Sequence, residues 1–324
     1  MPSYITDSRL NGYEAAFCGA MAGVVSRFFT APFDVVKIRM QLQPHRTQFH
    51  LKQASPSSHV KYDRVLPALK TILREEGVRG LYKGNLAAEY LYLLYNAVEF
   101  CAYREIELAI EKLDSKKQLP GSAKTFLGGM LAGCVATSIT YPLDLLRTRF
   151  AMQGTHNQQY TGIVQAVKLI YRTEGVAGFY WGVWPAVIQI MPYMGLVFAS
   201  YDHIASAFKA ARENGTLSAD YKPIHDMLSG ALSGVLSKTA VYPMDVVRKR
   251  LQVQGPSRKH YVIDSIPEYA TRSWFKCMTS IAEQEGVSSL YKGLTVSLVK
   301  VAPAISLTFF VYEKTKDTLL SWKE

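Results

Sequence analysis

A proline, an acid and a base occur three times in this chain at one fixed spacing, Pro-x-Asp-x-x-Lys/Arg. The three copies are Pro32, Asp34 and Lys37; Pro142, Asp144 and Arg147; and Pro243, Asp245 and Arg248. In a helix, residues three apart lie on neighbouring turns of one face. Each copy therefore presents an acid and a base together, and the chemistry open to them is ion pairing between helices. Because proline removes a backbone hydrogen bond, each copy should also bend its helix.

A second motif follows each copy. It reads EGVRGLYKG at 76–84, EGVAGFYWG at 174–182 and EGVSSLYKG at 285–293. The three prolines are 110 and then 101 residues apart. This recurrence predicts three repeats of about one hundred residues, at 11–112, 119–212 and 222–321.

Apolar and charged residues are segregated along the chain. Residues 183–200 contain no charge over 18 positions, which is close to the length needed to cross a bilayer. Five more apolar stretches complete two per repeat, at 14–31, 86–103, 126–143, 227–244 and 293–312. A soluble helical repeat protein with buried helices is the alternative. We expect an all-α membrane protein with six transmembrane helices.

Each repeat also contains a short amphipathic segment between its two apolar stretches. Apolar residues recur at helical spacing in 66–77, 163–175 and 275–286. Each segment ends at the glycine of a Glu-Gly pair, a common helix C-terminus. We expect three short surface helices.

The connectors that carry these helices are basic, as in HLKQASPSSHVKYDR at 50–64. Positive loops are retained on one side of a membrane. With an even number of spans, both termini would lie on the opposite side. The first 15 residues do not resemble a removable targeting segment.

The formal net charge of +11 could indicate nucleic-acid binding. The bases are divided between connectors and apolar stretches and lack an aromatic RNA-binding motif, so anionic lipids and anionic solutes are better partners. The four cysteines (Cys18, Cys101, Cys134 and Cys277) have no metal-ligand spacing. No phosphate-binding loop, His-Glu-x-x-His motif or convincing nucleophile–base pair is found, so we expect neither enzymatic activity, nor a metal, nor a cofactor.

The two recurring motifs resemble those of the mitochondrial carrier family, over nearly the whole chain. Trp181 departs from the pattern, because a Lys or Arg is usual there. The resemblance implies a threefold pseudosymmetric barrel of six helices in the inner mitochondrial membrane. It also implies a functional monomer with the surface helices and basic connectors in the matrix, both termini on the cytoplasmic side, and one central site opened alternately to each side.

By the family pattern, the repeated charges form a ring that closes the matrix side. Asp34 would pair with Arg147, Asp144 with Arg248, and Asp245 with Lys37. Gln41 and Gln252 occupy the positions that brace this ring, whereas repeat two has Ala151 there. A permanent, fold-stabilising network is the alternative to a gate.

A second ring of the family closes the cytoplasmic side, and here it is degraded. Its pattern is aromatic-Asp/Glu-x-x-Lys/Arg, which repeat one reverses with Arg104 and Glu107. Asp202 with Lys316 is the one pair of normal type, so the cytoplasmic gate should be weaker than the matrix gate.

Ionisable side chains in membrane helices are costly and are candidates for function. Outside the rings these are the bases Arg27, Lys238 and Lys300 and the acid Glu99. Their excess of positive charge favours an anion, and several convergent cations suit a phosphorylated one. Snorkelling or internal pairing of these bases is the alternative.

Family contact points lie seven or eight residues after the glycine that closes each downstream motif. They correspond to Leu91, to Gln189 with Ile190, and to Lys300. A first contact without charge, together with RKRLQV at 248–253, disfavours adenine-nucleotide exchange. Leu91 with Lys300, Arg27 and Lys238 resembles the pattern of the family's thiamine pyrophosphate carriers. So do the strings PFDVVKIRMQLQ at 32–43, DLLRTRFAMQG at 144–154 and SKTAVYPMDVVRKRLQVQG at 237–255.

The diphosphate of that substrate would then bind Arg27, Lys238 and Lys300. Tyr193 could stack on a ring, and Glu99 could meet the thiazolium or the pyrimidine amine. The alternatives are ordinary packing for Tyr193 and pairing with a cavity base for Glu99. Another phosphorylated solute, such as coenzyme A or a nucleotide, and a non-transporting membrane scaffold remain open.

Overall fold

A computed structural model describes residues 12–44, 61–62, 64–114, 120–154, 158–213, 222–263, 266–268 and 273–322. Over these ranges the chain is helical, and its extended pairing is an isolated bridge between Gln153 and Tyr261. The first eleven residues and most of the basic connector at 50–64 lie outside the described residues.

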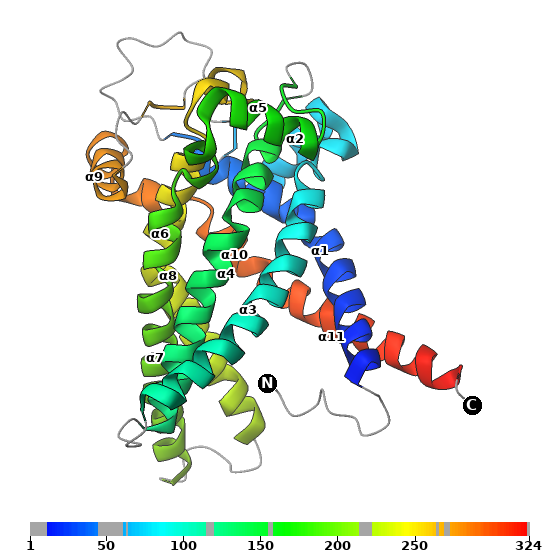
Figure 1. Ribbon diagram of the computed structural model, residues 1–324, viewed down its shortest axis with the longest axis vertical. Helices are drawn as coiled ribbons and strands as arrows, with labels where there is room; N and C mark the ends of the chain where they lie inside the picture. Colours follow the sequence, from blue (N-terminus) through cyan, green and yellow to red (C-terminus); the bar gives the residue numbers. More distant parts are fainter. Residues whose placement is uncertain are drawn as a thin grey trace.

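Each repeat consists of a long first helix, a short surface helix and a long second helix (Figure 1). The first helices are α1 (Gly12–Leu42), α4 (Gly121–Ala151) and α8 (Lys222–Gln252). The surface helices are α2 (Val65–Gly80), α5 (Ile163–Glu174) and α9 (Trp274–Glu285). The second helices are α3 (Asn85–Leu113), α6 with α7 (Val183–Ile188, Ile190–Glu213) and α10 with α11 (Leu294–Val299, Val301–Ser321). Short 3-10 turns precede two of them, η3 (Val176–Tyr180) and η6 (Val287–Tyr291), and a third, η5 (Pro256–His260), follows α8. The predicted all-α class and the three surface helices are confirmed.

The long helices close into a ring. α3 packs along α4, α7 along α8, and α11 returns to α1. In Figure 1, α2, α5 and α9 lie at one end of this ring, while the start of α1 and the end of α11 lie towards the other.

The repeated prolines lie inside the first helices, Pro32 in α1, Pro142 in α4 and Pro243 in α8. A proline cannot donate to the carbonyl four residues earlier, so each helix can bend there without losing a further bond. α1 visibly changes direction along its length (Figure 1). The ends of the three helices beyond the prolines meet at the end that carries the surface helices.

Two of the three second helices are interrupted, α6–α7 at Gln189 and α10–α11 at Lys300. Pro192 and Pro303 follow three residues after the interruptions and deprive the carbonyls of the preceding turn of a donor. Repeat one has Leu94 at the equivalent place, and α3 is continuous. The interruptions coincide with two of the three predicted contact points.

Each surface helix packs its apolar face on a first helix. Ala68 and Ile72 of α2 cluster with Val35 and Val36, and Ala166 and Ile170 of α5 cluster with Leu145 and Leu146. Cys277 and Ile281 of α9 do the same with Val247 and Leu251. Burial of these faces fixes the end of the ring where the charged motifs lie.

Three helical segments of the described chain are long and apolar enough to cross a membrane, by length and composition: Ala123–Ala151, Val176–Glu213 and Val287–Ser321. α1, α3 and α8 carry more ionisable groups, including most of the predicted ring and cavity charges. Large apolar side chains such as Phe100 and Phe310 point outwards, at 66% and 67% exposure. An outer surface of this kind suits lipid rather than water.

Candidate functional site

A cavity of about 340 Å³ lies where the first helices converge. Its charged lining, called the floor cluster below, consists of nine side chains from all three repeats. They are Asp34, Lys37, Asp144, Arg147, Lys238, Asp245, Arg248, Lys249 and Lys300. The volume is within the range of small-ligand sites.

Three ion pairs within this cluster join one repeat to another. Arg147 lies 2.7 Å from Asp34, Arg248 lies 2.8 Å from Asp144, and Lys37 lies 3.8 Å from Asp245. All three predicted ring pairs are therefore present. Whether they act as a gate stays a prediction.

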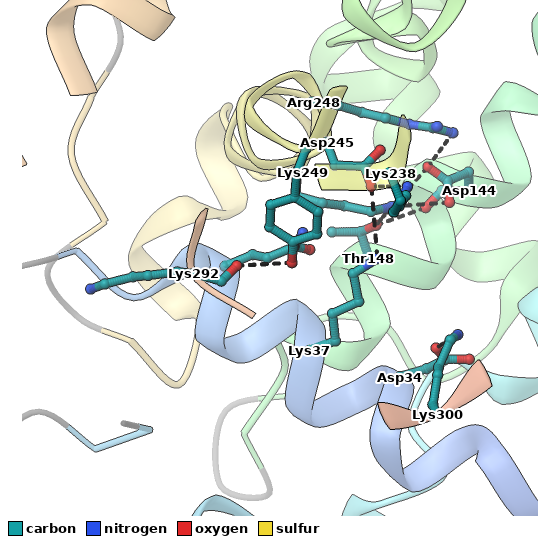
Figure 2. Close-up of polar contacts among 12 residues, drawn as sticks. Asp34, Lys37, Asp144, Thr148, Lys238, Asp245, Arg248, Lys249, Lys292 and Lys300 are labelled. Atoms are coloured by element: carbon teal, nitrogen blue, oxygen red, sulfur yellow. Dashed lines mark hydrogen bonds and ion pairs between the residues drawn. The ribbon is translucent and has the colours of Figure 1, made fainter. Parts of the chain in front are cut away.

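Each ring aspartate also binds a second cation (Figure 2). Lys300 pairs with Asp34 and Lys238 pairs with Asp245. Lys249 lies 2.9 Å from Asp144, which it shares with Arg248. Lys238 and Lys300 were predicted as anion-binding bases. In this conformation they are paired internally instead, because each is within reach of a buried carboxylate that needs neutralisation.

Lys249 was missed by the sequence reasoning. Its ammonium donates to both carboxylate oxygens of Asp144, at 3.0 and 2.9 Å, and to Thr148 Oγ1 and Gln252 Oε1, both at 2.9 Å. The signal was the residue after the ring base, which is Ile38 in repeat one and Thr148 in repeat two. A base there breaks the threefold pattern.

The two predicted brace residues behave differently. Gln252 donates to the Asp144 carboxylate and accepts a hydrogen bond from Thr148 at 2.7 Å. Gln41 donates to the Tyr242 hydroxyl at 3.0 Å, and that hydroxyl donates to the Lys292 carbonyl at 2.9 Å. Gln252 thus contacts the ring directly, whereas Gln41 acts on a neighbouring tyrosine.

Arg27 does not line the cavity. Its guanidinium stacks 3.0 Å from the ring centroid of Tyr92, which does line it. Arg27, predicted as an anion-binding base, therefore contacts Tyr92 instead of lining the cavity in this conformation, because an aromatic face on α3 attracts the cation. Arg147 also donates to the Tyr92 hydroxyl at 3.4 Å, so one tyrosine serves two guanidinium groups.

The contact-point residues Leu91, Gln189, Ile190 and Lys300 all line the cavity. Tyr193 and Glu99, predicted to meet the ligand's rings, are not among the lining residues that the structure describes. Glu99 instead accepts a hydrogen bond from the Tyr95 hydroxyl at 3.2 Å. Tyr92 and Tyr95 are the aromatic side chains of the described lining.

The predicted cytoplasmic pair is absent in this conformation. Lys316 pairs with Glu313 on its own helix, and Asp202 is exposed. The first helices converge at the end that carries the surface helices. At the opposite end, α7 with Asp202 and α11 with Lys316 are not brought together. Whether Asp202 and Lys316 pair in another state stays a prediction.

A further charged network, which the sequence analysis did not predict, lies next to the floor cluster. Arg39, Arg149 and Arg250 are 0 to 1% exposed and pair with Glu76, Glu174 and Glu285. Each arginine also donates to a backbone carbonyl of the following repeat, that of Ala151, Gln252 or Gln41, at 3.0 to 3.2 Å. The signal was an arginine two residues after each ring base and the glutamate of each Glu-Gly pair.

Burial raises the pKa of the Glu76 carboxyl, but hydrogen bonds from Arg39 and Lys83 and the charges of both bases outweigh burial. The pKa of Glu76 therefore lies below its ordinary value. The carboxylate stays ionised and fixes its surface helix to α1.

The sequence matches the family model described as "Mitochondrial carrier protein" three times, at residues 8–112, 119–211 and 219–322. These matches cover most of the chain.

Three curated relatives, each named mitochondrial thiamine pyrophosphate carrier 1, are similar over nearly their full length. The protein of Sclerotinia sclerotiorum is 42% identical over 311 residues, which cover 96% of this chain and 94% of the relative. That of Aspergillus oryzae is 45% identical over 307 residues, 93% and 92% of the two chains. That of Phaeosphaeria nodorum is 44% identical over 311 residues, 96% and 94% of the two chains.

Proposed function

Because the chain belongs to the mitochondrial carrier family, we propose that it is a transporter that moves thiamine pyrophosphate into the mitochondrial matrix by alternating access. The observation that carries this proposal is the floor cluster, in which six cations face three acids inside one cavity. The names of the relatives supply the candidate substrate. No bond needs to be made or broken, so no catalytic residue, metal or cofactor is required.

The charge of the cavity suits a diphosphate. A phosphate monoester carries about −1.5 to −2 near pH 7, and a diphosphate ester carries more. Hydrogen bonds between ammonium groups and phosphate oxygens are charge-assisted and so are stronger than neutral ones. The diphosphate would bind Lys238 and Lys300 in exchange for their aspartates, and Arg27 would join when it leaves Tyr92.

The rest of the substrate would lie against the uncharged lining. Tyr95, and Tyr92 once Arg27 has left it, would be the aromatic side chains to contact an aminopyrimidine or a thiazolium. Glu99 accepts a hydrogen bond from Tyr95, which itself lines the cavity, so Glu99 is one residue removed from the lining. Tyr193 would have to turn inwards to contribute.

Alternation requires a second state. Here the matrix ring is formed and the Asp202–Lys316 pair is not. In the proposed cycle, binding opens the matrix ring while Asp202 and Lys316 approach on the cytoplasmic side. Changing a state from 1:99 to 99:1 requires about 5.5 kcal/mol of differential affinity, which a few charge-assisted contacts can supply.

The same proposal places the protein in the inner mitochondrial membrane. α2, α5 and α9 would face the matrix, and both termini would face the intermembrane space. The basic connectors would contact anionic lipid headgroups. We propose a monomer, because all three repeats contribute to one cavity.

Uptake of labelled thiamine pyrophosphate into liposomes that contain the purified protein tests this function. Unlabelled ADP and coenzyme A are added as competitors in parallel. The proposal is supported if uptake is saturable and if unlabelled thiamine pyrophosphate inhibits it more strongly than ADP or coenzyme A does. Stronger competition by ADP or coenzyme A would assign another phosphorylated solute. An absence of uptake, repeated with labelled ADP and labelled coenzyme A, would favour a membrane scaffold.

A further inference from the structure

The floor cluster contains two kinds of cation. Arg147, Arg248 and Lys37 each pair with an aspartate of another repeat and hold the first helices together. The second cations, Lys238, Lys249 and Lys300, join aspartates that already have a ring partner, and Lys249 and Lys300 also do so across repeats. Three acids are thus surrounded by six cations, an excess of three positive charges on the described cavity wall.

The second cations are all lysines. An ammonium is a compact point charge that can exchange one oxygen acceptor for another. Lysines that are not needed to complete a ring pair are therefore the groups best suited to transfer from aspartate to phosphate.

Lys249 has more acceptors than it can satisfy. An ammonium has three protons, yet four oxygens lie within 3.0 Å of Lys249 Nζ. Asp144 would still hold Arg248 and Gln252 if Lys249 left. If Lys249 exchanged its present acceptors for an external anion, neither the lysine nor Asp144 would be left as an unpaired buried charge.

We propose that Lys249 is a third anion-binding lysine of the cavity, which completes with Lys238 and Lys300 a triad for the diphosphate of the substrate. The triad brings one lysine from beside each ring aspartate to the same cavity. This inference rests on the proposed function and adds a residue that neither the contact points nor the ring pattern selects. Its ligand class is a diphosphate with two or more negative charges.

The test compares Lys249→Met, which retains the stem without the charge, with Lys249→Arg, which retains the charge. Lys276→Met is the matched control, since Lys276 is an exposed lysine on α9 of the same repeat. Two readouts are measured: the KM for thiamine pyrophosphate uptake into liposomes, and the rise in Tm of the purified protein on addition of inorganic pyrophosphate. A purely structural lysine would alter basal Tm but not the rise that pyrophosphate produces.

We expect Lys249→Met to raise KM by about tenfold or more and to abolish most of the pyrophosphate-induced rise in Tm. Lys249→Arg should remain within about threefold of the unchanged protein, and Lys276→Met should match it. If Lys249→Met lacks a cooperative unfolding transition, Lys249→Gln, which can still donate to Asp144, takes its place.

A normal KM and a normal pyrophosphate response in the neutral variant would overturn the inference while leaving the proposed function intact. Equal losses in Lys249→Arg and Lys249→Met would also overturn it, because charge would not be the cause. If the unchanged protein takes up no thiamine pyrophosphate but shows a Lys249-dependent response to pyrophosphate, the anion site stands and the proposed substrate falls.

Discussion

Arg39 and Glu76 form an ion pair with two parallel hydrogen bonds, one of them 2.9 Å from Nη2 to Oε2, at 0% and 4% side-chain exposure. The same guanidinium reaches the carbonyl of Ala151 in the next repeat. One arginine therefore joins a surface helix, its own first helix and the neighbouring repeat. Its two counterparts repeat this arrangement around the ring.

We predict that Glu76→Gln costs about 3–5 kcal/mol of stability, since it leaves a buried guanidinium without its counter-charge. Glu75→Gln is the control on the neighbouring residue. Glu75 pairs with Lys61 at 42% and 34% exposure, so its loss should cost about 0–1 kcal/mol. Thermal unfolding in detergent measures both, and equal effects would contradict the assigned importance of the buried pair.

The lowered pKa of Glu76 gives this pair a pH dependence. Its stabilisation is complete above the unfolded-state pKa of glutamate, about 4.3, and is lost as pH falls through the lower pKa of the folded protein. The difference in Tm between the unchanged protein and Glu76→Gln should therefore persist at pH 5 and shrink only under more acidic conditions. A difference that disappears between pH 7 and 5 would contradict this.

Gly84 brings the start of α3 against the next repeat. Its φ is +81°, and an added Cβ would lie 2.6 Å from the carbonyl oxygen of Arg147. We expect Gly84→Ala to destabilise by about 1–3 kcal/mol, through backbone strain and displacement of a ring residue. Gly195→Ala, at a helical site with open space, should be neutral or stabilising. Similar Tm values for the two variants would refute the close packing.

The two brace glutamines provide another comparison. Gln252→Ala removes a donor to the ring acid Asp144 and an acceptor for Thr148, so we expect a loss of about 1–3 kcal/mol. Gln41→Ala removes one bond to Tyr242 and should cost about 0.5–1.5 kcal/mol. The reverse order in thermal unfolding would show that the Tyr242 contact matters more than the ring contact.

The repeat spacing predicted an acid and a base on one face of each first helix, whereas the pairing between repeats was predicted from the resemblance to the family. The partners of Lys238 and Lys300 could not be predicted, since local spacing gives the face of a side chain but not the acceptor that competes for it. Arg27 was misplaced for a similar reason, because Tyr92 lies on another helix. Lys249 was missed because it directly follows the ring residue Arg248. Adjacent residues of a helix point in different directions, so Lys249 was not expected to reach the same cavity.

The cytoplasmic pair illustrates a separate limit. Asp202 and Lys316 have the residue types of a gate, but the proposed cycle has two states and the structure describes one conformation. In that cycle, the Arg147–Asp34 and Lys316–Glu313 pairs would belong to one state. A pattern of residue types indicates which pairs are possible without indicating when they form.

The central claim is that positive charge at the cavity floor exists to bind a diphosphate. Its most direct test is uptake of labelled thiamine pyrophosphate into liposomes by the unchanged protein, by Lys300→Ala and Arg27→Ala, and by the exposed-site control Lys276→Ala. We predict saturable uptake by the unchanged protein and the control, and uptake near background for Lys300→Ala and Arg27→Ala. Normal uptake by Lys300→Ala and Arg27→Ala would contradict the claim.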